Sequence, residues 1–147
     1  MTASDPRAYP DRPFVAVSAA IFRNGRVLLV RRAKPPSNDL FTLPGGVVEV
    51  GETLEEALRR EVAEETRLVI APVGLVGHRE FIERDPDART ARHFIILAFA
   101  VRFVSGDVVL NEELAESRWV APAEVPELRT TEALAEIVAR AAEMVCD

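Results

Sequence analysis

The stretch GGVVEVGETLEEALRREVAEET, residues 45–66, decides how this sequence is interpreted. Seven glutamates lie between Glu49 and Glu65, against two arginines. Carboxylates at this density repel one another, so they are either solvated or arranged around something positive. Which of the two holds depends on the face of the local structure that each glutamate occupies.

Thr53 and Glu56 have the spacing of a capping box, so we expect a helix from Leu54 to about Thr66. Along such a helix, leucines and glutamates share one stripe. At positions i, i+4, i+7 and i+11 stand Leu54, Leu58, Glu61 and Glu65. If the leucines face the core, the carboxylates at the end of the stripe face the core as well, or a cleft at its edge.

A solvated helix would carry its glutamates opposite the leucines, and Glu55, Glu56 and Arg59 already occupy that outer face. Carboxylates that face inward are costly unless a cation neutralises them, and near the helix C-terminus they also oppose the macrodipole. Oxygen ligands select hard cations, and Mg²⁺ commonly shares its coordination with substrate phosphates. The pattern favours a metal site for phosphate chemistry, with a structural ion-pair network as the alternative.

Length and composition fit one globular domain: 147 residues, of which 48% are hydrophobic and 29% charged. We expect residues 1–12 to be a flexible lead-in and residues 13–147 to form the domain. A formal charge of −6 argues against a nucleic-acid or membrane partner. One cysteine allows no internal disulfide, and the N-terminus lacks a signal-peptide pattern, so we expect a cytoplasmic protein.

The remaining segments alternate between strand and turn patterns. Asn24-Gly25 separates two apolar runs, which predicts a β-hairpin. Strands are expected at 13–22, 26–32, 41–50 (two short strands around a turn), 73–83, 91–103 and 117–122. A C-terminal helix is expected at 131–145, capped by Thr130 or Thr131. This order predicts an α+β or α/β fold in which helices cover a mixed sheet.

The helix and the loop before it also match a family signature. In sequence order and at the expected spacing, the matching residues are Gly46, Glu52, Arg60, Glu61, Val62, Glu64, Glu65 and Leu68. This pattern resembles the signature box of the Nudix hydrolases, and the strand layout extends the resemblance to residues 13–145. It implies an α/β/α sandwich with a mixed sheet. It also implies Mg²⁺-dependent hydrolysis of nucleoside diphosphates linked to another group, with Mn²⁺ able to substitute.

The resemblance implies roles for individual residues. The metal ligands would be Glu61, Glu64, Glu65 and the carbonyl of Gly45. Arg60 would orient the catalytic Glu61, and Glu52 would support the loop–helix junction. An ordinary i,i+4 pair of Arg60 with Glu56 or Glu64 is compatible with that role.

Arg67 departs from the family pattern, which has glycine at this position. That glycine follows the helix end, where a left-handed backbone is easy only for glycine. The departure leaves the loop after Glu65 open to a different path, but it removes no ligand. We expect the substitution Arg67→Gly to be neutral or stabilising.

A carboxylate outside the box often serves as a base or extra ligand in this family. The segment 110–120 offers Glu112, Glu113 and Glu116. Glu113 is the first choice because of its separation from Trp119, and a solvated acidic loop is the alternative for each glutamate.

Substrate contacts are expected from Arg31 or Arg32, which end a strand and alternate in direction, so that one reaches phosphates and the other solvent. Gly46 is a further candidate for substrate binding. Three aromatic residues are candidates to stack on a base, with core packing as the alternative for each: Phe41, Phe81 and Tyr9.

The resemblance favours an ADP-ribose pyrophosphatase, which would split ADP-ribose or a related ADP-sugar into AMP and a sugar phosphate. A proline expected about sixteen residues beyond the box is absent, because position 84 is Arg and Pro86 is only nearby. The alternatives are a nucleoside triphosphate pyrophosphatase for normal or oxidised nucleotides, and a non-catalytic nucleotide-sensing module. The expected partner is a nucleotide-derived small molecule. A homodimer would fit, since Nudix-like proteins are often dimers.

Overall fold

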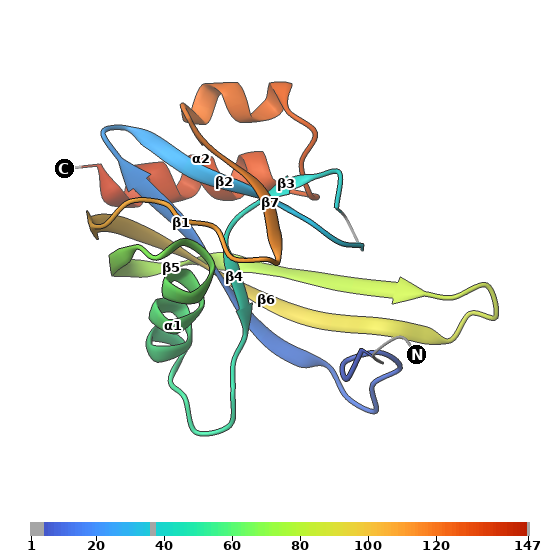
Figure 1. Cartoon of the computed structure of the whole chain (residues 1–147). Helices are drawn as coiled ribbons and strands as arrows, with labels where there is room; N and C mark the ends of the chain where they lie inside the picture. The colour runs from blue at the N-terminus through green and yellow to red at the C-terminus, as the bar shows by residue number, and fades with distance from the viewer. Residues whose placement is uncertain (1–4, 36–37, 147) are drawn as a thin grey trace.

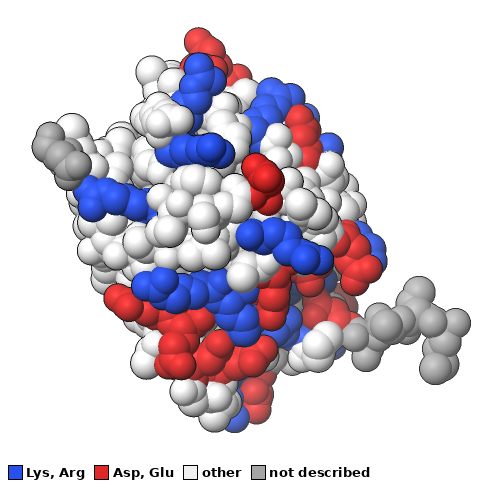
Figure 2. Space-filling model, turned by 60° about the vertical axis from the view of Figure 1, so that its left-hand side comes forward, with Lys and Arg blue, Asp and Glu red and all other residues white. Residues whose placement is uncertain are grey.

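The computed structural model describes residues 5–35 and 38–146 and shows a twisted sheet between two helices (Figure 1). The elements, in chain order, are β1 (Phe14–Arg23), β2 (Arg26–Arg32), β3 (Phe41–Thr42), β4 (Gly45–Val47), α1 (Leu54–Thr66), β5 (Val69–Arg84), β6 (Thr90–Ser105), β7 (Leu114–Val120), the 3₁₀ helix η1 (Pro122–Glu127) and α2 (Leu134–Val145). Among the described residues, no helix has both the length and the apolar character needed to cross a bilayer. Acidic and basic side chains lie next to one another on the face shown in Figure 2.

The sheet is mixed, with the strand order β3-β2-β1-β6-β5. Strand β1 runs parallel to β6 along Phe14–Phe22, while its other pairings are antiparallel. On the opposite edge of β1, β4 pairs with Ala16–Ser18 and β2 with the last two residues. Strand β7 completes the sheet beside β2. This arrangement brings β4, which immediately precedes the α1 loop, against the centre of the sheet.

Alternate side chains of β1 and β2 pack against opposite helices, which explains the layered fold. One core cluster joins the sheet to α1 through Val17, Ala19, Ile21, Leu28, Val30, Leu58 and Val62. The other joins it to α2 through Ala20, Phe22, Val27, Leu29, Leu134, Val138 and Ala141. The expected α/β/α sandwich with a mixed sheet is therefore confirmed, because α1 and α2 cover opposite faces (Figure 1).

Helix α1 has the bounds that the sequence predicts. The Thr53 hydroxyl accepts from the Glu56 N–H at 3.1 Å, and the Glu56 carboxylate accepts from the Thr53 N–H at 3.0 Å. At the other end, Arg67 adopts φ 66° and ψ 11°, and its N–H donates to the Ala63 carbonyl. Arginine thus takes the left-handed conformation that glycine adopts easily.

The C-terminal helix begins later than expected. Neither Thr130 nor Thr131 caps it; Ala133 precedes the first turn in a left-handed conformation, with no side-chain cap. The Thr131 hydroxyl instead bonds the Thr42 hydroxyl at 3.1 Å, and its N–H donates to the Phe41 carbonyl. The threonine that looks like a cap therefore ties this segment to β3. Helix η1, which contains Pro126, was not predicted.

Residues 5–12 are held against the β5–β6 hairpin, whereas the sequence suggests a flexible lead-in. The Tyr9 N–H donates to the Ala91 carbonyl at 2.8 Å, and the Tyr9 hydroxyl donates to Asp85 at 2.9 Å. The Arg89 guanidinium lies over the Tyr9 ring, 4.5 Å from its centroid. Residues 1–4 of the expected lead-in lie outside the described part of the chain.

Candidate active site

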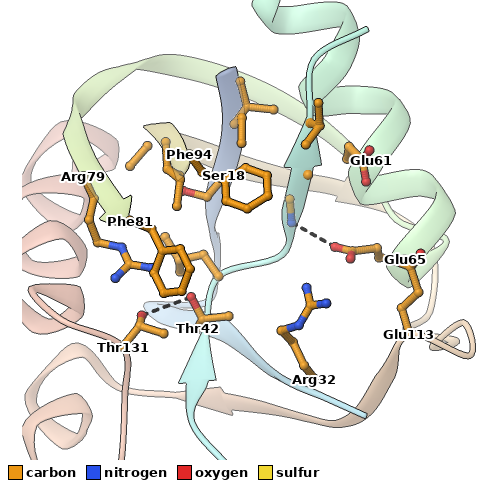
Figure 3. Close-up of a pocket in the computed structure, with 18 of the residues that line it drawn as sticks. Ser18, Arg32, Thr42, Glu61, Glu65, Arg79, Phe81, Phe94, Glu113 and Thr131 are labelled. Atoms are coloured by element: carbon orange, nitrogen blue, oxygen red, sulfur yellow. Dashed lines mark hydrogen bonds between the residues drawn. The ribbon is translucent and has the colours of Figure 1, made fainter. Parts of the chain in front are cut away.

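A cleft of about 690 Å³ lies between the end of α1, strand β4 and the open face of the sheet. Figure 3 shows Glu61, Glu65 and Glu113 on one side of it, Arg79 and Phe81 on the other, and Arg32 nearer the carboxylates. Most of the residues singled out in the sequence line this cleft: Arg32, Gly45, Gly46, Arg60, Glu61, Glu64, Glu65, Glu112 and Glu113.

Glu65 is the most buried carboxylate of the cleft, with 4% of its surface exposed. Its Oε1 accepts a hydrogen bond from the Gly45 N–H at 2.8 Å, which joins α1 to β4. Burial raises the pKa of Glu65 to about 8, and the nearby charges of Glu61 and Glu113 act in the same direction. In the absence of a cation, Glu65 therefore favours its neutral form near neutral pH.

Glu61 lies one helical turn before Glu65 and faces the same cleft (Figure 3). Burial raises its pKa, and the hydrogen bond from Arg60 opposes that shift. A Cβ atom at position 46 would collide with the Glu61 carboxylate, so Gly46 provides the space in which that carboxylate lies. Strand β4 and helix α1 are thus fitted to each other at the site.

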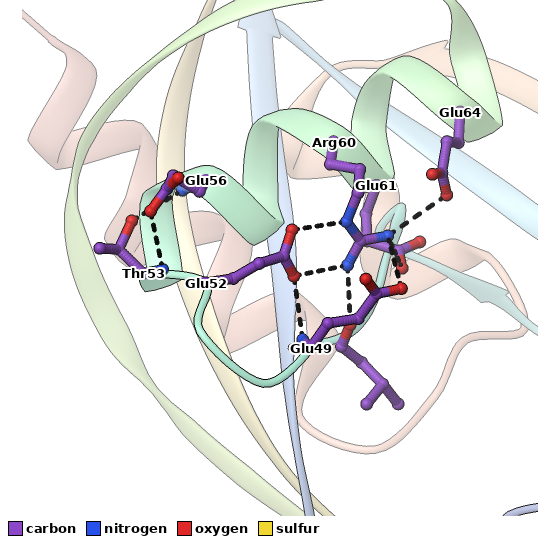
Figure 4. A network of polar contacts seen from close by, with 8 residues as sticks. Glu49, Glu52, Thr53, Glu56, Arg60, Glu61 and Glu64 are labelled. Atoms are coloured by element: carbon purple, nitrogen blue, oxygen red, sulfur yellow. Dashed lines mark hydrogen bonds and ion pairs between the residues drawn. The ribbon is translucent and has the colours of Figure 1, made fainter.

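Arg60 holds the loop before α1 and the carboxylates on the helix together (Figure 4). Its Nε and Nη2 donate to the two oxygens of Glu52 at 2.6 and 2.8 Å, and Nη2 also donates to the Val47 carbonyl at 3.0 Å. Its Nη1 donates to Glu61 at 2.9 Å and to Glu64 at 3.3 Å. The hydrogen bonds from Arg60 lower the pKa of Glu52 to about 2 and, reciprocally, raise the pKa of Arg60.

The three acidic candidates in the segment before and within β7 occupy different places. Glu112 and Glu113 line the cleft, and the negative charge of Glu113 contributes to the raised pKa of Glu61 and Glu65. Glu116 instead accepts from Arg31 at 3.2 Å and from Arg118 at 2.9 Å, and these bonds lower its pKa. As a candidate base or extra ligand, Glu113 therefore fits the geometry better than Glu116, and Glu112 lines the same cleft.

Comparison with known proteins identifies the family. A model of the NUDIX domain matches residues 12–141 of this chain. The chain belongs to the Nudix family. It is 34% identical over 116 residues to an ADP-ribose pyrophosphatase of Methanocaldococcus jannaschii, covering 79% of this chain and 66% of that protein. It is 33% identical to an NAD-capped RNA hydrolase NudC of Edwardsiella ictaluri, covering 83% of this chain but only 44% of that protein.

A solved Nudix structure agrees with the fold. The MutT NUDIX hydrolase from Burkholderia pseudomallei superposes with a TM-score of 0.74 at 27% identity, covering 92% of this chain and all of that one. The chain spans between 44% and 66% of the length of these two relatives, which are named for the hydrolysis of nucleotide derivatives. Nudix hydrolases use divalent cations.

The donor atoms of this Nudix site fit a hard divalent cation, because they are all carboxylate or carbonyl oxygens. Glu65 is buried and Glu61 is partly buried, and burial raises the pKa of both, so a cation beside them would favour their ionised forms. Glu64 is turned toward Arg60, so no three acidic, histidine or cysteine side chains of the described residues converge on one point. Its side chain is 55% exposed and lines the cleft.

The expected substrate contacts divide between the cleft and the rest of the Nudix domain. Arg32 lines the cleft, whereas Arg31 pairs with Glu116 outside it. Phe41 is 7% exposed, packs in the α2-side core and has Arg118 over its ring. The structure therefore places Phe41 in the core rather than in the cleft, as the alternative of core packing describes.

Phe81, a candidate for base stacking, lines the cleft. Three other cleft residues were not singled out from the sequence: Arg79 on β5, Ser18 and Phe94. Strand alternation places Arg79 and Phe81 on the same face, which is the one signal that points to them. The sequence does not show which face of β5 is open.

Proposed function

We propose that this chain hydrolyses the pyrophosphate bond of a nucleoside diphosphate derivative, with ADP-ribose or a related ADP-sugar as substrate. We propose Mg²⁺ as the cofactor, with Mn²⁺ able to replace it. One observation carries the proposal: the buried Glu65 carboxylate and Glu61 share a cleft with Arg32. Carboxylates suited to a metal ion and a guanidinium suited to a phosphate therefore line the same cleft. The similarity to a protein named ADP-ribose pyrophosphatase supports the choice of substrate.

The proposed metal ligands are Glu61, Glu64, Glu65 and the Gly45 carbonyl. When bound, a divalent cation neutralises phosphate charge and lowers the pKa of a coordinated water. Glu64 would exchange its bond with Arg60 for the metal, while Arg60 keeps Glu61 in place through its bonds to Glu52.

Glu113 is the proposed base. It would accept a proton as water attacks one phosphorus, while the bridging P–O bond breaks and its electrons leave with the other phosphate. Arg32 would contact the phosphate charge, and Gly46 would leave space beside Glu61. The products from ADP-ribose are AMP and ribose 5-phosphate.

A nucleoside triphosphate pyrophosphatase is the second candidate, and the structural likeness to a MutT NUDIX hydrolase favours it. Its reaction would use the same carboxylates but release pyrophosphate. A nucleotide-sensing module without activity is disfavoured, because the glutamates of the signature box are all present and Glu65 is buried beside Glu61.

Product analysis separates these candidates. The protein would be incubated with ADP-ribose, ATP and NAD, each with and without Mg²⁺, and the products resolved by chromatography. We expect AMP and ribose 5-phosphate from ADP-ribose only when the cation is present. Pyrophosphate release from ATP without ADP-ribose turnover would favour the second candidate. No turnover by a folded protein would favour the sensing module.

A further inference from the structure

The end of the cleft away from the carboxylates is formed by one face of strands β5, β6 and β1. Arg79 and Phe81 project from β5 into this end (Figure 3). The strand register places them opposite Ile96 and Phe94 of β6. Helix α2 covers the same face farther along the sheet, at Ala20 and Ala100, but leaves this part open.

This end of the cleft presents apolar and aromatic surface. Its floor consists of Phe94, Ile96 and Ala98, and Leu134 and Ile137 of α2 form a wall. The Phe81 and Phe94 ring centroids lie 6.4 Å apart with an interplanar angle of 42°. Such a surface suits a flat, partly apolar group better than a phosphate or a bare sugar.

Arg79 places hydrogen-bond donors at the edge of this surface. Its guanidinium lies 5.7 Å from the Phe81 ring centroid and has neither a hydrogen bond nor an ion pair with any described residue. By contrast, Arg60 and Arg92, which also line the cleft, are both paired. The Glu132 carboxylate, which also lines the cleft, attracts the Arg79 guanidinium electrostatically without a hydrogen bond or ion pair between them. A half-buried guanidinium without a hydrogen bond has lost hydration that an acceptor on a ligand would replace.

Resting on the proposed function, we propose that Phe81 and Arg79 form the nucleobase subsite. The base stacks on Phe81, and an acceptor on its edge receives hydrogen bonds from Arg79. Every nucleobase carries ring-nitrogen or carbonyl acceptors, which match a side chain that can only donate. A substrate so placed directs its phosphates toward Arg32, Glu61 and Glu65.

A purely structural role for Arg79 makes a different prediction. If the guanidinium served only to pack on Phe81, its replacement would change stability without changing ligand selectivity. The nucleobase proposal requires selectivity to change: a ligand with a base must lose affinity, and a ligand without one must not.

The test is calorimetric binding of AMP and of ribose 5-phosphate, which lacks a base, to the wild type and the variants in the presence of Mg²⁺. We expect AMP to bind at least about tenfold more tightly than ribose 5-phosphate. Arg79→Met and Phe81→Leu should each weaken AMP binding roughly tenfold. Neither should alter the affinity for ribose 5-phosphate.

Arg84→Met is the matched control. Arg84 lies on the same strand, bonds Thr90 at the hairpin end and does not line the cleft, so AMP affinity should not change. Arg79→Lys, which keeps a charged donor, should recover part of the affinity lost in Arg79→Met. Thermal unfolding of each variant checks that it is folded.

Equal affinity for the two ligands in the wild type, or unchanged AMP affinity in both Arg79→Met and Phe81→Leu, would overturn the nucleobase subsite. This binding assay needs no turnover. If ADP-ribose is not hydrolysed but both substitutions weaken AMP binding as expected, the proposed function is removed and the nucleobase subsite stands. If ADP-ribose is hydrolysed but neither substitution changes the affinity for AMP, the proposed function stands and the nucleobase subsite is removed.

Discussion

The Glu61 carboxylate occupies the space that a side chain at position 46 would need. The backbone of Gly46 has no positive φ, so other residues can adopt its conformation, and the requirement for glycine is one of space. The collision would involve the carboxylate itself, because its carbon and both oxygens are the nearest atoms. Strand β4 and the face of α1 that carries Glu61 are therefore matched at this contact.

Gly46→Ala should displace Glu61 while leaving the sheet intact. We expect kcat for the preferred nucleotide to fall on the order of 100-fold, as misplacement of a catalytic group by about an ångström does. Gly77→Ala is the matched control, since Gly77 has a compatible backbone and open space at its Cβ position. Steady-state kinetics measure kcat for both variants. Equal kcat values would show that the position of the Glu61 carboxylate does not affect turnover.

Glu113 and Glu116 should behave differently although they lie three residues apart. Glu113→Gln should lower kcat by roughly 10²–10⁴-fold if Glu113 is the base. Glu116→Gln should leave kcat close to the wild-type value, because Glu116 pairs with Arg31 and Arg118 outside the cleft. A larger loss of kcat in Glu116→Gln would contradict the assignment, and a full rate in Glu113→Gln would direct attention to Glu112.

The metal-free protein should lose stability as pH rises. Glu65 has a pKa of about 8 when folded and an ordinary value of 4.5, so between these values the folded state holds a proton that the unfolded state releases. Its contribution is full below about pH 4.5 and is lost as pH rises through about 8. Chemical denaturation in a chelator should show a fall on the order of 1–4 kcal/mol, absent in Glu65→Gln.

Added Mg²⁺ should reverse this trend, because the cation binds the ionised carboxylate and competes with the proton. Stabilisation by Mg²⁺ should therefore be larger at pH 8 than at pH 6.

Glu52 should make stability depend on pH in the acidic range, and with the opposite sign to Glu65. Its pKa of about 2 means that the stability from its pair with Arg60 is present above about pH 4.5 and is lost as pH falls toward 2.

Arg67→Gly should be neutral or stabilising, by up to about 1 kcal/mol, because Arg67 has a φ of 66°. Part of the gain is offset by the greater freedom of glycine in the unfolded chain. Ala139→Gly provides the contrast: Ala139 lies exposed within α2, where glycine should cost about 1 kcal/mol. Urea denaturation of both variants measures the signs, and a clear destabilisation by Arg67→Gly would count against the strain argument.

Local patterns in the sequence predict the parts of the site that a single element determines. The Thr53–Glu56 capping box fixes where α1 begins, and helical spacing then places Glu61 and Glu65 on one inward stripe. Strand alternation correctly separates Arg31 from Arg32. These features follow from contacts within a few residues of each other.

Features that depend on several elements were missed. The cleft position of Arg79 depends on the register of β5 with β6, which shifts at several points along the strands. The burial of Phe41 depends on β3 packing over the α2-side core. Threonine is a common residue at helix N-caps, but the Thr131 hydroxyl bonds the Thr42 hydroxyl, 89 residues away in sequence. Such long-range pairings leave no mark on local periodicity.

The most direct test of the central claim compares Glu65→Gln with Glu55→Gln for hydrolysis of ADP-ribose at a series of Mg²⁺ concentrations. Glu55 lies on the same helix but is exposed on its outer face, so it matches the chemistry of the change without touching the cleft. We predict Mg²⁺-dependent turnover in the wild type and Glu55→Gln, and a loss of at least about 100-fold in Glu65→Gln. Mg²⁺-dependent turnover by Glu65→Gln at the wild-type rate would contradict a metal-holding role for the buried carboxylate.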